Sequence, residues 1–190
     1  MSRTVLAQPP FAIKSLLLAL SLCLGAVACT PGAQAEPVQP TARQPAPPAP
    51  DFQGIHRWIN SPPLRMSQLR GKVVLVEFWT YACINCLHVQ PHVNRWHARY
   101  RDQGLAVVGV HTPEYDYEHL TGNVRAAVER LGIDYPVAQD NDYATWNAYG
   151  NRFWPAMYLI DRDGRIVYKH YGEGDYDKTE AMIRELLAER

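Results

Sequence analysis

Residues 73–86 read VVLVEFWTYACINC, and this stretch decides the fold. Its first six residues are apolar and mostly β-branched with one acid among them, which predicts a buried strand. Residues 84–102 follow as a predicted helix, because apolar side chains recur on one face at about 100° per residue. That face holds Cys86, Val89, Val93, Trp96 and Tyr100. A buried strand therefore leads directly into a helix that begins at a pair of cysteines.

Strands and helices continue to alternate toward the C-terminus. The further elements are predicted as a strand over 105–110, helices over 118–131 and 143–149, strands over 156–160 and 166–171, and a helix over 176–189. Gly132 ends the first of these helices, and the turn sequence 161–164 joins the last two strands. This order predicts an α/β protein with helices packed on a central mixed sheet.

The N-terminal residues differ in composition from the rest of the chain. Residues 15–28 are uncharged and mostly apolar, and 14 residues are fewer than the roughly 20 that a membrane-spanning helix needs. We therefore predict a signal peptide over 1–28, an uncleaved anchor being the alternative. The sequence AVAC at 26–29 resembles a lipobox, which predicts lipid attachment at Cys29. Cleavage after the small-x-small site at 33–35 is the other possible processing step.

A proline-rich segment follows, with seven of the 15 prolines in residues 31–50. Proline favours extended polyproline II, so residues 29–50 are predicted to be a tether and residues 51–190 the folded domain. The protein is thus expected to be exported, to the periplasm or the outer face of a bacterial membrane, and lipid-anchored.

Composition gives no support for nucleic-acid binding and excludes a disulfide-dense scaffold. The 19 Lys and Arg balance the 19 Asp and Glu, so nothing in the net charge predicts a nucleic-acid partner. Four cysteines are too few for a disulfide-dense scaffold.

The pair Cys83-x-x-Cys86 is the strongest chemical signal. A thiolate at a helix N-terminus meets free N–H groups and the positive end of the helix dipole, which stabilise it. Cys83 lies at this end and is predicted to attack a partner's sulfur, whereas Cys86 lies one turn further on the buried face and is predicted to resolve the mixed disulfide. We expect this catalytic pair to need no cofactor beyond its own redox-active disulfide, Cys83–Cys86.

Other uses of the two cysteines fit the sequence less well. A structural disulfide closing four residues would stabilise the fold by only about 2 kcal/mol. A zinc site would need more ligands, but a second CxxC is absent and His88 and His92 face away from Cys86. Haem attachment requires a histidine at position 87, where leucine stands. We therefore predict no metal.

Two further residues are candidates for tuning the dithiol. Glu77 lies in the strand before Cys83, where burial would raise its pKa and let it relay the proton of Cys86. The alternative is a solvated acid at a strand edge. His111 ends the next strand and is a candidate for tuning the thiolate, with a solvated or capping histidine as the alternative.

The ordered set of motifs resembles the thioredoxin-like superfamily, and within it the exported TlpA/DipZ-like redoxin branch of thiol–disulfide oxidoreductases. The shared motifs are WINSPPL at 58–64, EFWTYACINC at 77–86, Pro91, GVHTPE at 109–114 and YGNRFWPA at 149–156. The resemblance covers nearly all of residues 55–190.

This resemblance implies a thioredoxin-like fold with an inserted helix before the strand that follows a cis-proline. Pro155 would be the cis-proline facing the disulfide, and the backbone at Trp154 would pair with substrate. Protein thiols and disulfides of the cell envelope would be the substrates, in cytochrome maturation or disulfide repair, with a membrane thiol-transfer protein as electron donor. Ile84-Asn85 adds no cation beside the thiolate, so we expect an intermediate or reducing potential.

Two other functions stay open at this point. Thr80-x-x-Cys83 matches part of the peroxiredoxin pattern, but Val76 stands where that family has proline. A copper-delivery module would use the cysteines and His111, but such relatives usually space their cysteines by three residues rather than two.

Overall fold

The computed structural model describes residues 46–189, so the predicted signal peptide, Cys29 and most of the tether lie outside the described residues. Six strands form one mixed sheet in the order β1-β4-β3-β2-β5-β6. The strands are β1 (Arg57–Ile59), β2 (Val73–Trp79), β3 (Leu105–His111), β4 (Val137–Gln139), β5 (Ala156–Ile160) and β6 (Ile166–Tyr171). The α-helices are α1 (Ile84–Tyr100), α2 (Thr121–Arg130), α3 (Ala144–Ala148) and α4 (Tyr176–Ala188), and the 3₁₀ helices are η1 (Met66–Leu69), η2 (Arg101–Gln103) and η3 (Asp116–His119).

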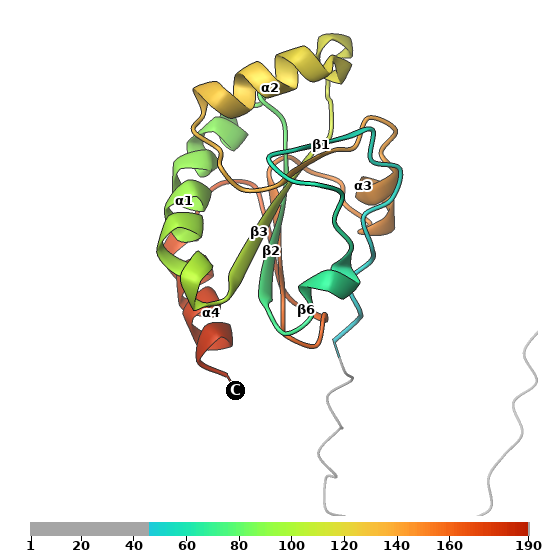
Figure 1. The fold of residues 1–190 in the computed structure, drawn as a ribbon. Coiled ribbons are helices and arrows are strands. Elements are labelled where there is room, and N and C mark those ends of the chain that lie inside the picture. Colours follow the sequence, from blue (N-terminus) through green and yellow to red (C-terminus); the bar gives the residue numbers. More distant parts are fainter. Residues whose placement is uncertain (1–45, 190) are drawn as a thin grey trace, which may run out of the picture. The chain divides into compact units, whose positions relative to one another are not determined.

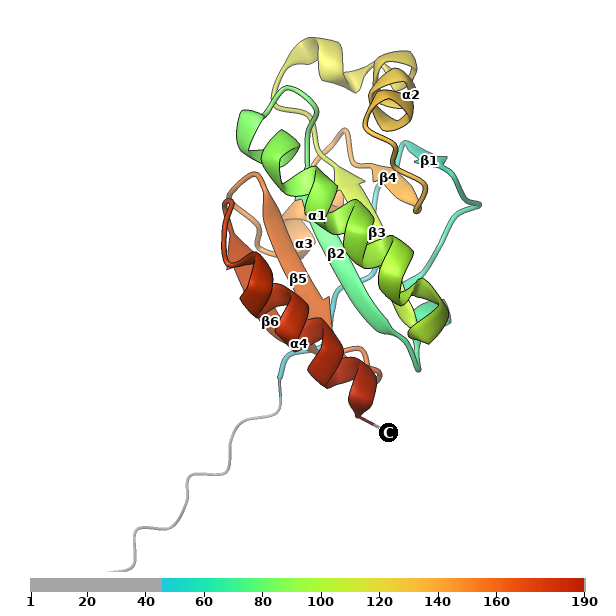
Figure 2. The same cartoon turned by 90° about the vertical axis from the view of Figure 1, so that its left-hand side faces the viewer.

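The central strands fix the topology. β2 and β3 run parallel, as do β3 and β4, whereas β5 pairs antiparallel with both β2 and β6. Helices α1 and α4 cover one face of the sheet, and α3 lies on the other (Figures 1 and 2). This is the predicted arrangement of a central mixed sheet flanked by helices.

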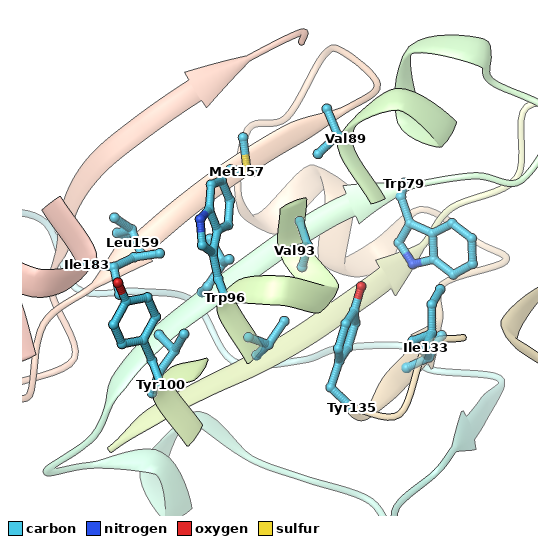
Figure 3. Packing of buried hydrophobic residues seen from close by; sticks show 14 of the residues in the cluster. Trp79, Val89, Val93, Trp96, Tyr100, Ile133, Tyr135, Met157, Leu159 and Ile183 are labelled. Carbon is cyan, nitrogen blue, oxygen red and sulfur yellow. The ribbon is translucent and has the colours of Figure 1, made fainter. Parts of the chain in front are cut away.

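Side chains of β2 alternate between two buried clusters. One cluster, which packs with α1 and α4 and is partly drawn in Figure 3, includes Val73, Leu75, Trp79, Cys86, Val89, Val93, Trp96 and Ile183. The other packs with α3 and includes Val74, Val76, Phe78, Trp146 and Tyr158. The predicted apolar face of α1 is therefore the face that covers the sheet, and the strand before the cysteines is buried on both sides.

The structure departs from the predicted elements in several places. The helix predicted over 84–102 ends at Tyr100, where the 3₁₀ helix η2 follows, and η1 was not predicted. Strands β1 and β4 were not predicted; they pair with each other in antiparallel register. The helix predicted over 118–131 is divided into η3 and α2, because the backbone is extended at Leu120. The end of the predicted tether also packs on the domain, since Pro48 pairs with Arg165 and the Ala49 N–H donates to the Gly164 carbonyl at 2.9 Å.

Gly109 lies in β3 opposite Glu77 and lets two aromatic rings approach the sheet. A Cβ there would lie 2.9 Å from Trp79 Nε1 and 3.2 Å from Tyr135 Cε2. Gly109→Ala is therefore expected to lower the free energy of unfolding by about 1–3 kcal/mol, measured by urea denaturation. The control is Gly122→Ala in α2, where a Cβ meets nothing within 4 Å. Alanine should stabilise that helix by about 0.5–1 kcal/mol, and equal effects at the two sites would contradict the packing argument.

Candidate active site

The two cysteines lie at the start of α1, as predicted. Cys83 is the N-cap residue with extended backbone and is partly exposed, whereas Cys86 is 1% exposed. Both are free thiols. Burial, above all, and the hydrogen bond with Cys83 raise the pKa of Cys86, while a backbone hydrogen bond from Thr80 acts in the opposite direction. One sulfur is thus accessible, and the other is held as a protonated thiol beneath it.

Glu77 is fully buried on the α1 side of β2, which excludes the solvated alternative. Burial raises its pKa to about 8, although the Tyr135 hydroxyl, which donates to Oε2 at 3.2 Å, partly offsets this rise. Among residues 46–189, Oε1 has no hydrogen-bond partner. Glu77 therefore keeps its proton at neutral pH more readily than an ordinary glutamate does.

Tyr135 and Gln90 complete the surroundings of Glu77. Gln90 donates from Nε2 both to the Tyr135 hydroxyl and, at 3.0 Å, to Asn94 Oδ1. The sequence did not reveal either residue as part of the site. Gln90 sits inside a helix pattern, and Tyr135 alternates with Ile133 and Val137 in a short period-two pattern that predicts burial but no contact with Glu77. Tertiary packing alone brings them to Glu77.

His111 is fully buried, so it is not the solvated histidine of the alternative interpretation. Its ring stacks on Tyr81 and lies edge-on to Trp79, with centroid distances of 5.5 and 5.2 Å. Burial lowers its pKa to about 4, and Nε2 lies 3.4 Å from the Thr80 hydroxyl. His111 is thus neutral at physiological pH and packs behind the segment that leads to Cys83.

The Trp154–Pro155 peptide bond is cis, as the resemblance implies. Ala156, the next residue, pairs with Phe78, so the cis bond lies at the edge of the sheet where β2 ends. Trp154 is half-buried, and its indole N–H donates to the Thr112 carbonyl at 3.0 Å. The exposed side chain of Phe153 precedes it. Sheet topology therefore brings the predicted proline and the cysteines to the same edge.

A second buried acid near the cysteines was not predicted. Glu118 of η3 is fully buried, although Tyr117 and His119 beside it are exposed. Its carboxylate accepts hydrogen bonds from Thr80 and Ala82, the residues just before Cys83. A lone acid between exposed residues carries no local signal of burial, so sequence reasoning passed over it.

Within residues 46–189, no three His, Cys, Asp or Glu side chains are grouped so that they could hold a metal ion. His88 lies at the surface with Glu173, its Nδ1 2.9 Å from the carboxylate. No helix in this part of the chain is both long and apolar enough to cross a membrane.

The chain is similar to known proteins in sequence and in fold. Residues 45–187 match the redoxin family. Over 142 residues, 73% of the chain, the sequence is 54% identical to Protein DipZ of Mycobacterium bovis, of which the match spans only 20%. It is 30% identical to the thiol-disulfide oxidoreductase YkuV of Bacillus subtilis, over 75% of this chain and 95% of that protein.

Solved structures of thiol–disulfide exchange proteins have a similar fold. A DsbE-like thiol:disulfide interchange protein from Chlorobium tepidum superposes with a TM-score of 0.65 at 27% identity, over 75% of this chain and 97% of its own. The match to the family covers well over half of the chain and includes both cysteines, the buried acid and the cis-proline. The chain therefore belongs to the redoxin family, and its folded part is a thiol–disulfide oxidoreductase domain with the thioredoxin-like fold.

Proposed function

We propose that the whole protein reduces or isomerises protein disulfides in the cell envelope, with Cys83 as the attacking thiol. The observation that carries this proposal is the asymmetry of the dithiol. Cys83 is the N-cap residue and is partly exposed, whereas Cys86 is buried and its pKa is raised, so it is harder to ionise. An accessible first thiol and a protected second thiol are what two successive exchange steps require.

In the first step the Cys83 thiolate attacks one sulfur of a substrate disulfide. A Cys83–substrate disulfide forms, the substrate S–S bond breaks, and one substrate thiolate leaves. In the second step Cys86 loses its proton and attacks Cys83 Sγ, which releases the second substrate thiolate and forms the Cys83–Cys86 disulfide. Two electrons have then passed to the substrate, whose two thiolates take up the two protons.

Glu77 is proposed as the group that receives the Cys86 proton. Both groups are buried on the same side of β2, and the negative charge of an ionised Glu77 is one of the lesser causes of the raised pKa of Cys86. A carboxyl whose pKa is about 8 is close to the pH at which it must both accept and return a proton. Trp154 and Pro155 would face the substrate chain, and His111 would tune the site as a neutral ring.

The proposed envelope location and membrane anchor follow from the predicted signal peptide and from the similar proteins. Lipid at Cys29 would anchor the domain to the outer face of a bacterial membrane, where a membrane thiol-transfer protein would reduce the Cys83–Cys86 disulfide again. The similarity to a DsbE-like interchange protein and to DipZ supports an envelope location. Apocytochromes are one substrate class that fits such a reductase.

Trapping tests the roles of the cysteines. Cys86→Ala removes the resolving thiol, so mixed disulfides should accumulate at Cys83 and appear on non-reducing gels. Cys83→Ala is the matched control and should trap nothing. If the control captures partners and Cys86→Ala does not, the two roles are reversed.

The reduction potential of the pair tests the direction of transfer. We expect equilibration with glutathione to give a value well below that of the strong oxidant DsbA, about −120 mV. The dipeptide Ile84-Asn85 carries no cation that would stabilise a thiolate, and burial raises the pKa of Cys86. Neither feature stabilises the reduced form in the way that makes DsbA a strong oxidant. A potential near the DsbA value would show an oxidase instead.

A further inference from the structure

The segment that joins β2 to the cysteines is held by η3. All three of its residues, Thr80, Tyr81 and Ala82, donate hydrogen bonds to that 3₁₀ helix. The Thr80 hydroxyl and the Ala82 N–H donate to Glu118 Oε1, the latter at 3.1 Å. The Tyr81 hydroxyl donates to the Tyr117 carbonyl at 3.1 Å. Residues 80–82, which connect β2 to the dithiol, are thus held by hydrogen bonds to a segment more than thirty residues away in the sequence.

Glu118 is the centre of this arrangement. Its second oxygen, Oε2, accepts the N–H groups of Glu114 at 2.7 Å and Tyr115 at 3.0 Å. Two donors at each oxygen occupy the four lone-pair sites of a carboxylate, which accepts hydrogen bonds but donates none. Because the residue is fully buried, no water competes for these bonds. One side chain therefore ties together the start of η3 and the approach to Cys83.

The held segment adjoins both cysteines of the pair. Ala82 directly precedes Cys83, and a backbone hydrogen bond from Thr80 lowers the pKa of the Cys86 thiol. Thr80 is also close to His111, whose Nε2 lies 3.4 Å from its hydroxyl. A shift of this segment would therefore displace the attacking sulfur and the donor that faces the resolving sulfur at the same time.

We propose that Glu118 is a positioning residue for thiol–disulfide exchange, which holds Thr80 and Ala82 so that both sulfurs keep their reactive geometry. This inference rests on the proposed function. It gives the segment between β3 and α2 a role in catalysis, because the carboxylate that fixes the dithiol comes from η3 in that segment rather than from the strand or helix that carries the cysteines.

Glu118→Gln tests the proposal with a side chain of the same shape. Its amide has one acceptor oxygen and an NH₂ group that must face N–H or O–H donors, so part of the network is lost. We expect exchange with insulin disulfides to slow by at least about tenfold, since small displacements of reacting groups have effects of this size or larger. The Thr80 donor would no longer be aligned with Cys86. The reduced state should therefore lose stabilisation, and the potential should become more negative by about 30 mV for a tenfold change.

Asp116→Asn is the matched control, because it removes a charge from the exposed side of the same 3₁₀ helix and should leave both readouts unchanged. If Glu118→Gln does not fold, Thr80→Val removes one of the same donors and should shift rate and potential in the same directions. A folded Glu118→Gln protein with unchanged rate, or with an unchanged or higher potential, overturns the positioning role. A wild-type protein that does not exchange thiols with insulin overturns the proposed function itself.

Discussion

Cys83→Ser is expected to lower the rate of disulfide reduction by at least about a thousandfold, a loss typical of removing a covalent nucleophile. The serine hydroxyl does not ionise at neutral pH and forms no bond to sulfur, so the first exchange step has no attacking group. The fold should persist, because Cys83 is a partly exposed N-cap residue and serine is favoured at that position. Turbidity from reduced insulin, with a dithiol as electron donor, measures the loss.

Cys86→Ala separates the first step from the second. This variant keeps the attacking thiol, so it should release one equivalent of substrate thiol rapidly and then stop as a mixed disulfide. A stopped-flow burst of about one equivalent, followed by no turnover, is the expected trace. If Cys86→Ala turns over steadily, a second thiol is not required, and a peroxidase-like or monothiol route would have to replace the proposed one.

The regular part of the fold was predictable because its signals are local. β2 is a continuous apolar run, and the buried positions of α1 repeat with the helical period, so both lie where the sequence placed them. β1 and β4 have three residues each and are held mainly by pairing with each other and with β3. Segments this short carry no period of their own, so only the tertiary structure reveals them.

The residues of the site fall into the same two groups, those predicted from the adjacent sequence and those that only the tertiary structure places there. Cys83, Cys86 and Glu77 belong to one stretch whose spacing already predicts a dithiol with an acid beneath it. Tyr135 and Glu118 reach that stretch from segments far along the chain. Glu118 lies between exposed residues, and the apolar alternation around Tyr135 predicts that it is buried but not that it contacts Glu77. His111 was predicted at the strand end, but its burial depends on Tyr81 and Trp79, which close over it. Residues that hold reactive groups in place are therefore harder to find from sequence than the reactive groups themselves.

Glu77→Gln is expected to stabilise the protein increasingly as pH rises. The pKa of Glu77 is about 8 in the folded protein, against 4.5 for an ordinary glutamate. Between these two values the unfolded chain loses the proton and the folded protein keeps it, so the unfolded state binds fewer protons and stability falls with pH. The difference at pH 8 is on the order of 4 kcal/mol for a shift of this size. Glutamine, which cannot ionise, does not suffer this loss.

Urea unfolding of the reduced proteins at pH 5 and pH 8 measures the effect. The stability of the variant relative to wild type should be nearly constant below about pH 4 and should grow up to pH 8. Asp163→Asn, which replaces an exposed acid in the β5–β6 turn, should show no such trend. Parallel pH profiles for wild type and Glu77→Gln would mean that Glu77 holds no extra proton. The same variant should prolong the lifetime of the Cys83 mixed disulfide by about a hundredfold, because glutamine cannot accept the Cys86 proton. If both results hold, Glu77 lowers the stability of the fold at neutral pH and accelerates the attack of Cys86 on the mixed disulfide. Its buried position would then be explained by its role in the reaction rather than by its contribution to packing.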